Sequence, residues 1–221
     1  LVQIELKRRG ADLKEAFYQI RRYRHDCRAG LYNCLQLFVI TNGTDTKYFS
    51  NTDHTLAYTD TFYWADTHNR RIADLSAFAH TFLKKQHLLE ILTHYMVLNA
   101  SEKLLMVMRP YQIHACKALV RHALYTTGNG YIWHTTGSGK TLTAFKASKL
   151  LSACPCVKKV FLLVDRRDLD VQTCEEFNKL EAGCIDCTDK TDALIFQIQN
   201  PAKQLIITTI QKMSRAVRLS K

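Results

Sequence analysis

The sequence predicts an α/β protein built from two successive α/β parts, and three observations predict it. Residues 2–6 alternate apolar and polar side chains and precede an amphipathic segment with a capping signal. Residues 35–41 form an apolar run that ends in an Asn-Gly turn. From residue 110 to residue 208, helical and strand patterns alternate. Such alternation is typical of a parallel sheet with helices on both faces.

The first strand and helix follow from their periodicities. Val2, Ile4 and Leu6 alternate with polar residues, which is the pattern of a half-buried strand. After Gly10, Asp12 and Glu15 form a capping box that predicts the start of a helix. Its apolar residues recur at helical spacing and are Leu13, Ala16, Phe17 and Ile20.

The run from Leu35 to Thr41 predicts a strand covered on both faces. Asn42-Gly43 then predicts a turn into a second strand over 46–49. Residues 53–69 are polar and aromatic without a clear period, so we expect irregular structure there.

Two helical patterns, at 75–84 and 87–97, are followed by a polar break at 99–102. We interpret this break as the boundary before the second part of the chain. The predicted organisation is residues 1–73, a helical linker over 74–100, and residues 101–221. The elements expected in the last part are a helix at 110–125, a strand at 131–133, a helix at 142–151, a strand at 159–164, a helix at 168–180 and a strand at 205–208.

A glycine-rich loop after the strand at 131–133 is the most informative motif. It contains Thr136, Gly137, Ser138, Gly139, Lys140 and Thr141. The glycines let backbone N–H groups approach phosphate oxygens, at the positive end of the following helix. Lys140 would reach the β- and γ-phosphates of ATP, and the Thr141 hydroxyl would hold Mg²⁺. His134 stands where the strict motif has glycine, which favours helicase-type motors over nucleotide kinases. The alternative is a turn that is rich in glycine by chance.

A second candidate site lies at the start of the chain. Glu5 and Lys7 share one face of the first strand, as a metal-dependent nuclease requires, with Glu5 as the Mg²⁺ ligand and Lys7 stabilising phosphate charge. Gln19 and Tyr23 lie at i and i+4 on the following helix, so they project from one side beside the site. The nearby arginines 21, 22, 24 and 28 offer guanidinium groups to a DNA backbone. The alternatives are an exposed ion pair and a solvated helix face.

Further contacts are expected at element ends in the second part. Arg109 and Gln112 begin a helix before the glycine-rich loop, and the Gln112 amide can pair with an adenine edge. Residues 163–169 and 208–211 follow strands and carry Arg, Thr and Gln suited to a DNA backbone. Each of these segments could also be an ordinary cap or turn.

Composition bounds the function classes. A formal net charge of +11 with a pI near 9.3 favours a polyanionic partner, nucleic acid before membrane, over a basic surface that binds nothing. No stretch is apolar for long enough to span a bilayer. The eight cysteines show no disulfide framework or zinc-finger spacing, so we expect buried, reduced thiols in a cytoplasmic protein. The chain opens in a strand without Met, and we therefore expect a piece of a longer protein.

These motifs, in this order, resemble the motor (R) subunit of type I restriction enzymes. Residues 2–7 and 19–23 resemble its PD-(D/E)xK nuclease core and Q-x-x-x-Y signature. Residues 108–112, 133–141, 164–169 and 208–211 resemble its superfamily 2 helicase-type motor. The resemblance implies the C-terminal part of the nuclease core followed by part of a RecA-like motor domain. It implies a subunit that uses ATP and Mg²⁺ to translocate and cut double-stranded DNA, together with specificity and methyltransferase subunits.

The resemblance also shows which parts are missing. The nuclease aspartate expected before Glu5 and the acidic motor motif expected after Gln211 are absent, so we expect the chain alone to complete neither reaction. Two other interpretations stay open. One is another helicase–nuclease, such as a type III restriction subunit, although there the nuclease follows the motor. The other is a non-catalytic ATP- and DNA-binding remnant of a broken gene.

Overall fold

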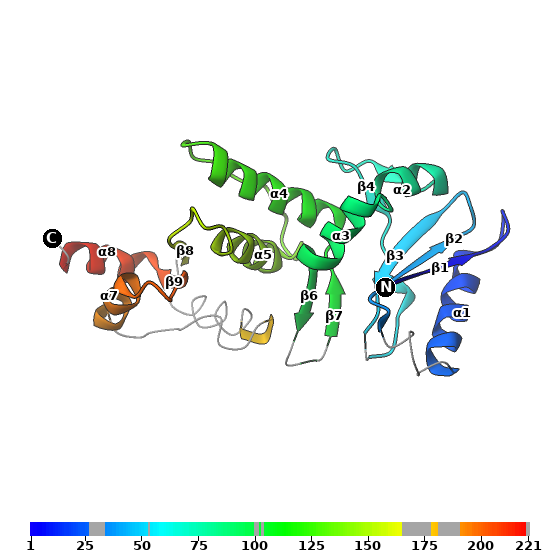
Figure 1. The fold of residues 1–221 in the computed structure, drawn as a ribbon, viewed down its shortest axis with the longest axis horizontal. Coiled ribbons are helices and arrows are strands. Elements are labelled where there is room, and N and C mark those ends of the chain that lie inside the picture. The colour runs from blue at the N-terminus through cyan, green and yellow to red at the C-terminus, as the bar shows by residue number, and fades with distance from the viewer. Residues whose placement is uncertain are drawn as a thin grey trace. The chain divides into compact units, whose positions relative to one another are not determined.

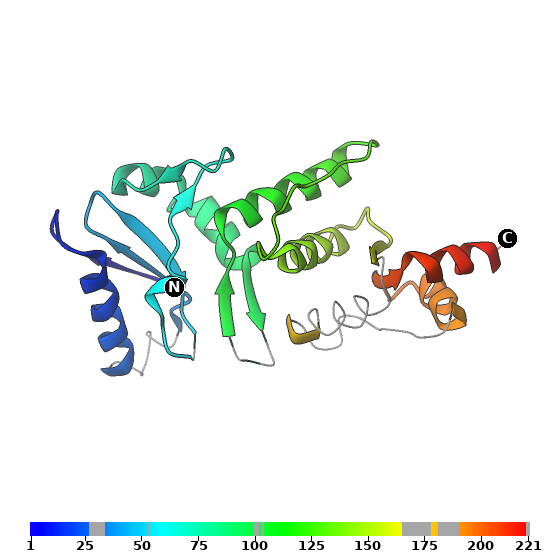
Figure 2. The same ribbon diagram turned by 180° about the vertical axis from the view of Figure 1, so that it is seen from behind.

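The computed structural model describes residues 1–26, 34–52, 54–99, 102, 104–164, 178–180 and 191–219. These residues form two compact units, Leu1–His114 and Ala115–Lys221. Figures 1 and 2 show the elements of each unit from opposite sides. The polar break at 99–102, which we predicted as the boundary, instead lies between two paired strands of the first unit.

A three-stranded sheet and one helix open the first unit. The strands are β1 (Val2–Leu6), β2 (Leu37–Thr41) and β3 (Thr46–Ser50), in the order β1-β2-β3. β1 runs parallel to β2, and β3 runs antiparallel to it. The helix α1 (Leu13–Asp26) packs on one face of this sheet (Figure 1). The predicted strands, helix and Asn-Gly turn are therefore confirmed.

Local hydrogen bonds explain where α1 begins, and apolar packing explains which face it buries. The Asp12 carboxylate accepts from the Lys14 N–H at 2.9 Å and so caps the helix, whereas the predicted capping box pairs Asp12 with Glu15. All four apolar residues predicted for the buried face are at most 5% exposed. They pack against Phe38, Ile40 and Phe49 of the sheet, which fixes the helix on that side.

The buried face of β1 differs from the prediction. Ile4 is 43% exposed and Leu6 is 61% exposed, whereas the Glu5 and Lys7 side chains are 13% and 22% exposed. The reason is the pairing register. Glu5 pairs with Ile40, and Ile40 faces α1, so the polar row of β1 also faces the helix. The alternation of apolar and polar residues predicted the strand correctly, but it could not show which of the two faces of β1 the helix α1 covers.

Short elements complete the first unit. Two antiparallel pairs are β4 (Trp64–Ala65) with β5 (Arg71–Ile72), and β6 (Met96–Asn99) with β7 (Leu104–Val107). The helices are α2 (Leu75–Thr81) and α3 (Lys85–His94), and a 3₁₀ turn covers Tyr58–Asp60. Two predictions were wrong here. The helix expected over 87–97 ends at His94 and gives way to β6, and the segment 53–69 contains a strand.

An aromatic cluster packs on the other face of the three-stranded sheet. The Tyr48 ring lies 4.6 Å from the ring of Phe82, and Trp64 lies 5.1 Å from the same ring. Tyr48 is fully buried, and its hydroxyl donates to the Met108 carbonyl at 3.2 Å. Burial raises the pKa of Tyr48 well above its ordinary range, so this phenol remains a neutral donor.

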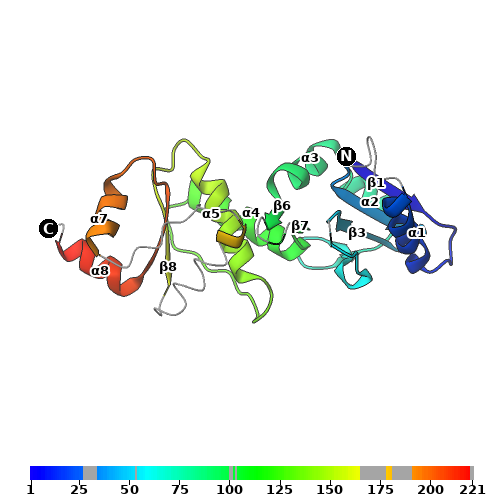
Figure 3. The same cartoon turned by 90° about the horizontal axis from the view of Figure 1, so that it is seen from below.

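The helix α4 (Pro110–Tyr125) begins in the first unit and continues into the second, with the bounds predicted from the sequence. The second unit then contains α5 (Lys140–Ser152) and a parallel pair of strands, β8 (Val160–Val164) and β9 (Leu205–Thr209). The helices α7 (Thr191–Gln199) and α8 (Ile210–Leu219) pack together beside this pair (Figure 3). Neither helix was predicted.

One predicted strand of the second unit is absent from the described residues. Residues 131–133 have no strand pairing, and Tyr131 and Trp133 are 90% and 87% exposed. An apolar segment becomes a strand only when a neighbouring strand satisfies its backbone, and none pairs with it among the described residues. Most of the helix predicted over 168–180 lies outside the described residues. Within that range the structure describes residues 178–180, and these are helical.

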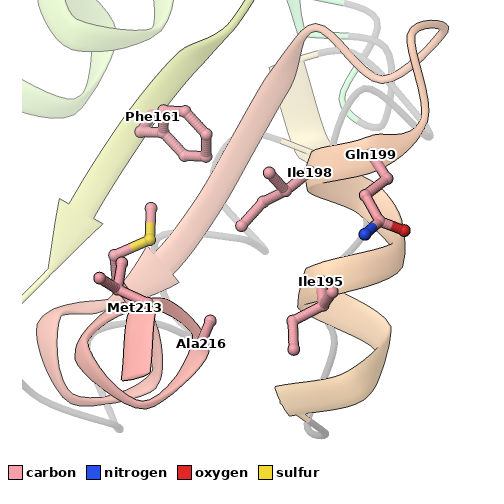
Figure 4. Close-up of a pocket in the computed structure, with 7 residues that line it drawn as sticks. Phe161, Ile195, Ile198, Gln199, Met213 and Ala216 are labelled. Atoms are coloured by element: carbon pink, nitrogen blue, oxygen red, sulfur yellow. The ribbon is translucent and has the colours of Figure 1, made fainter. Parts of the chain in front are cut away.

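An apolar pocket of about 330 Å³ lies among β8, α7 and α8 (Figure 4). Gln199 contributes the polar side chain of its lining, and the other lining residues are Phe161, Ile195, Ile198, Met213, Ala216 and Val217. This lining offers no cation or hydroxyl for a phosphate. The pocket therefore does not serve as the predicted nucleotide site.

The cysteines depart from the expectation of uniformly buried thiols. Cys116 is buried, but Cys34 and Cys156 are exposed and Cys154 is half-buried. Cysteines 27, 174, 184 and 187 lie outside the described residues. Burial raises the pKa of Cys116 to about 11, an effect that Lys146 and Lys117 partly oppose.

Candidate functional site

A continuous chain of polar contacts joins the four residues predicted for the nuclease site. The Lys7 ammonium lies 3.3 Å from Glu5 Oε1 and also donates to Gln19 Oε1. Gln19 Nε2 in turn lies 2.5 Å from the Tyr23 hydroxyl, to which it donates. The structure therefore brings together all four residues that the sequence predicts to act together: Glu5 on β1, Lys7 directly after it, and Gln19 and Tyr23 on α1.

Local geometry explains this arrangement. Glu5 and Lys7 are two residues apart on a strand, so their side chains share one face. Gln19 and Tyr23 are four residues apart on α1, so they lie one turn apart on the flank of the helix nearest β1. The contact between Lys7 and Gln19 fixes the position of the ammonium relative to the Glu5 carboxylate. An orienting contact of this kind holds a charged group ready without movement during a reaction.

The donor set at this site suits Mg²⁺ in part. Mg²⁺ prefers oxygen ligands and keeps several waters, with one or two protein carboxylates. Glu5 supplies one such carboxylate. The described residues contain no cluster of three or more His, Cys, Asp or Glu side chains placed to hold a metal. Glu5 fits the role of a single carboxylate ligand.

The arginines on α1 do not behave alike. Arg24 donates to the carbonyls of Thr52 and His54, the latter at 2.9 Å, so it ties the helix to the loop after β3. These bonds give Arg24 a structural role, and its contact with DNA stays a prediction. Arg21 stacks over the Tyr18 ring at 5.7 Å, and Arg22 is exposed. Arg28 lies outside the described residues.

The glycine-rich loop precedes α5 in a left-handed conformation at two positions. Gly137 has φ 74° and Gly139 has φ 80°, a region that only glycine adopts without strain. Ser138 Oγ donates to the Thr135 carbonyl at 2.7 Å, and Lys140 Nζ donates to the same carbonyl at 3.2 Å. Sequence reasoning missed Thr135, because a backbone carbonyl leaves no signal in the residue type.

The loop residues fit a bound phosphate chain. Gly139 is the N-cap of α5, so the positive end of a 13-residue helix opens at the loop. Lys140 and Thr136 are exposed, and Thr141 is half-buried. A Cβ added at Gly137 would meet no atom within 4 Å, so there is open space beside the loop backbone. A cation, hydroxyls and a helix N-terminus are the groups that phosphate oxygens require, and binding of a nucleotide here stays a prediction.

Arg109 and Gln112 have a different local role from the one predicted. Gln112 is 5% exposed, and its Oε1 accepts from the Arg109 N–H at 2.9 Å, which caps the start of α4. The Arg109 guanidinium lies 4.9 Å from the centre of the Phe62 ring. Both residues belong to the first compact unit and the loop belongs to the second. Their contact with a nucleotide stays a prediction.

Comparisons with known families and proteins identify the lineage. Residues 1–55 match the family described as type I restriction enzyme R protein N terminus, and residues 111–221 match the SWI2/SNF2 ATPase family. A putative type I restriction enzyme endonuclease subunit, C-terminal part, from Mycoplasma pneumoniae is 39% identical over 166 residues, which are 70% of this chain and 80% of that protein. The chain belongs to the type I restriction enzyme R subunit family.

Longer R subunits are more similar still. The type I restriction enzyme endonuclease subunit of Staphylococcus saprophyticus is 53% identical over 99% of this chain and 23% of its own length. A counterpart from Staphylococcus aureus strain COL is 50% identical over 99% of this chain and 24% of its own length. The chain thus spans about a quarter of the length of these R subunits. None of its described helices has the length and apolar character needed to cross a membrane.

Proposed function

We propose that this chain carries a metal-dependent DNA-cleaving site and the start of an ATP-driven motor within an R subunit. The observation that carries the proposal is the chain of contacts from Glu5 through Lys7 to Gln19 and Tyr23. The relatives named as endonuclease subunits support it, as does the match of residues 111–221 to an ATPase family. The first part is then the C-terminal portion of a PD-(D/E)xK nuclease core, and the second belongs to a RecA-like domain.

Each site residue has a defined task in this proposal. Glu5 holds Mg²⁺, which supplies a Lewis acid for phosphodiester cleavage. Lys7 stabilises charge on the phosphate, and Gln19 and Tyr23 keep Lys7 in position. In the second unit, residues 136–141 bind the ATP phosphates, with Lys140 as the main cation and the Thr141 hydroxyl as a Mg²⁺ ligand. Arg109 and Gln112 assist at the nucleotide.

The proposed setting is a restriction complex in the cytoplasm. The substrate is double-stranded DNA, and the partners are specificity and methyltransferase subunits. The basic composition, with a net charge of +11, supports a polyanionic substrate. The nuclease residues precede the phosphate loop in the chain, which favours a type I over a type III arrangement.

Paired substitutions in the complete R subunit test the two sites separately. Glu5→Ala and Lys7→Ala should abolish DNA cutting and leave DNA-stimulated ATP hydrolysis near the parent rate. Lys140→Ala should weaken ATP binding by tens- to a hundredfold, because it removes a charge-assisted contact worth about 2–3 kcal/mol. Lys158→Ala, a change at an exposed lysine in the same unit, is the control for the lost charge.

The outcomes are distinguishable by calorimetry and a cleavage assay. Loss of both activities in a folded Glu5→Ala protein would mean that the two-site assignment is wrong. Unchanged nucleotide affinity in Lys140→Ala would remove the glycine-rich loop from the proposal.

A further inference from the structure

A cluster of cations and tyrosines lies beside β3, away from the contacts of Glu5 and Lys7. The Lys47 ammonium lies 4.4 Å from the centre of the Tyr58 ring and 4.8 Å from that of Tyr63. The Arg71 guanidinium lies 3.1 Å from the Tyr63 ring centre. Arg71 also pairs with the Asp45 carboxylate at 2.5 Å. We call Lys47, Tyr58, Tyr63 and Arg71 the Lys47 cluster.

Lys47 has a cation's charge but only neutral direct partners. Its ammonium donates to the Thr61 hydroxyl at 3.2 Å, and no carboxylate of the described residues lies within ion-pair distance of it. Asp45 Oδ1 is occupied by Arg71 and by the Tyr63 hydroxyl, which donates to it at 3.0 Å. A partly buried cation without an anion is energetically unfavourable. Binding of an anion beside Lys47 would therefore stabilise the site.

The titration behaviour of the cluster agrees with this geometry. Burial, and then the charge of Arg71, lowers the pKa of Lys47, and Asp45 opposes the shift. Burial and the hydrogen bond to Asp45 raise the pKa of Tyr63 to about 12, and burial also raises the pKa of Tyr58. Both phenols therefore stay neutral and do not act as counter-ions for Lys47. An anion bound beside Lys47 would raise its pKa again and favour the charged form.

The sheet register places Lys47 on the same face of the sheet as Glu5, the face on which α1 packs. Glu5 pairs with Ile40, and Ile40 pairs with Lys47, so these three residues form one row across β1, β2 and β3. Residues in such a row project from the same face of a sheet. Two strand spacings separate Glu5 from Lys47, which is about 10 Å. Ile40, the middle residue of the row, is fully buried beneath α1, so a duplex cannot lie along this row itself and would contact Lys47 separately from Glu5.

We infer that the Lys47 cluster is a phosphate-binding site that holds the DNA backbone beside β3. The inference rests on the proposed function of Glu5 and Lys7. The ligand is a phosphodiester oxygen and not a base, because the Tyr63 ring already carries two cations and is not available for stacking. Lys14 lies 5.8 Å from the Tyr58 ring centre and adds a third cation to the site. Contacts of this kind position DNA without reading its sequence.

The test measures how salt affects DNA binding by the complete R subunit. A fluorescent duplex of arbitrary sequence is titrated without Mg²⁺, so that no cutting occurs, at several chloride concentrations. Lys47→Gln should lower affinity by about tenfold and reduce the slope of log K against log salt by about one. Lys47→Arg retains the charge and should keep the parent slope. Lys85→Gln removes a charge from an exposed position on α3 and should also keep it.

Several results would overturn the inference. One is a parent-like slope in Lys47→Gln. Another is an equal loss in Lys85→Gln, which would show a general charge effect. A third is weaker ATP binding by Lys47→Gln with DNA binding unchanged, which would reassign the anion to a nucleotide. If Lys47→Gln does not fold, Lys47→Arg decides the question, because a reduced slope in a folded protein that keeps the charge contradicts the inference.

The experiment also separates this inference from the proposed function. If Glu5→Ala still cuts DNA, the nuclease assignment fails whatever the salt slopes are. If Glu5→Ala does not cut and Lys47→Gln binds DNA like the parent, only the Lys47 cluster is wrong.

Discussion

The Tyr23 hydroxyl occupies the far end of the polar chain that begins at Glu5. It accepts from Gln19 Nε2 at 2.5 Å, while Gln19 Oε1 accepts from the Lys7 ammonium. Among the described residues, Tyr23 is linked by hydrogen bonds to Lys7 only through Gln19. Its role in the proposed reaction is therefore positioning: it fixes the Gln19 amide so that the oxygen faces Lys7.

Removing that hydroxyl should slow cleavage without weakening DNA binding. Tyr23→Phe deletes one hydrogen bond, worth about 0.5–1.5 kcal/mol, so the cutting rate should fall by a few-fold to about tenfold. Single-turnover cleavage at saturating protein measures the rate, and a binding titration measures affinity. Tyr18→Phe is the matched control, because Tyr18 is an exposed tyrosine on the same helix. Equal rates for the parent and Tyr23→Phe would show that Tyr23 does not position Gln19.

At the scale of elements, one lysine closes the end of α7. The Lys159 ammonium donates to the carbonyls of Gln197, Asn200 and Lys203, the first at 3.1 Å and the last at 2.6 Å. The last carbonyls of a helix lack partners within the helix, and a cation near them also interacts favourably with the helix dipole. Lys159 precedes β8, so this contact ties the end of α7 to the start of a strand.

Replacing Lys159 should loosen α7 locally. Lys159→Met keeps most of the side-chain stem but leaves those carbonyls without their charged donor, a loss of about 1.5–3 kcal/mol. The amides of α7 should then exchange hydrogen at least tenfold faster, as measured by mass spectrometry on the intact protein. The neighbouring, exposed Lys158→Met should leave the exchange of α7 unchanged. Identical exchange in both variants would mean that packing alone closes the helix.

Elements whose signals are local could be predicted, and elements that depend on a distant partner could not. The Asp12 cap and apolar spacing of α1, and the Asn-Gly turn after β2, are contained within a few residues. Residues 96–99 are different. Their mostly apolar sequence is compatible both with the end of a helix and with a strand. Only their pairing with residues 104–107 makes them the strand β6. The same dependence explains why residues 131–133, which have no partner strand in the described parts of the chain, are not a strand.

The candidate site divides in the same way. Glu5 with Lys7, and Gln19 with Tyr23, could be predicted because each pair is set by strand or helix spacing. The Lys47 cluster could not, because its members come from β3, a 3₁₀ turn and the segment at 63–71. Only the sheet register brings Lys47 onto the face of Glu5. The one available signal was the mixture of aromatic and basic residues in a segment that we expected to be irregular.

At the scale of the whole molecule, the unfolding of the two compact units can be measured separately through the reactivity of a cysteine thiol in each unit. Cys34 belongs to the first unit and is exposed, whereas Cys116 belongs to the second and is buried. The thiolate is the reactive form of cysteine. With a pKa raised to about 11, Cys116 stays almost entirely protonated near neutral pH.

The second unit should therefore lose stability in alkali. In the unfolded state the Cys116 thiol has its ordinary pKa, whereas in the folded state its pKa is raised to about 11. Above pH 9 the unfolded state therefore binds fewer protons than the folded state. Stability from this group is complete below about pH 9 and declines as the pH rises towards 11. Unfolding monitored between pH 8 and pH 11, and iodoacetamide labelling of each thiol, measure the effect. Cys116→Ala should flatten the decline, and rapid labelling of Cys116 at neutral pH in the folded protein would contradict it.

The outward row of β1 has a practical consequence for work with this chain. Ile4 and Leu6 are exposed on the edge strand of the three-stranded sheet. An edge strand with apolar side chains is a template for pairing with other molecules, so concentrated samples of this chain will tend to self-associate. The other row of side chains, which includes Glu5 and Lys7, faces α1 and cannot be altered without disturbing the candidate site. Replacing Ile4 with lysine would improve solubility during purification and leave Glu5 and Lys7 in place.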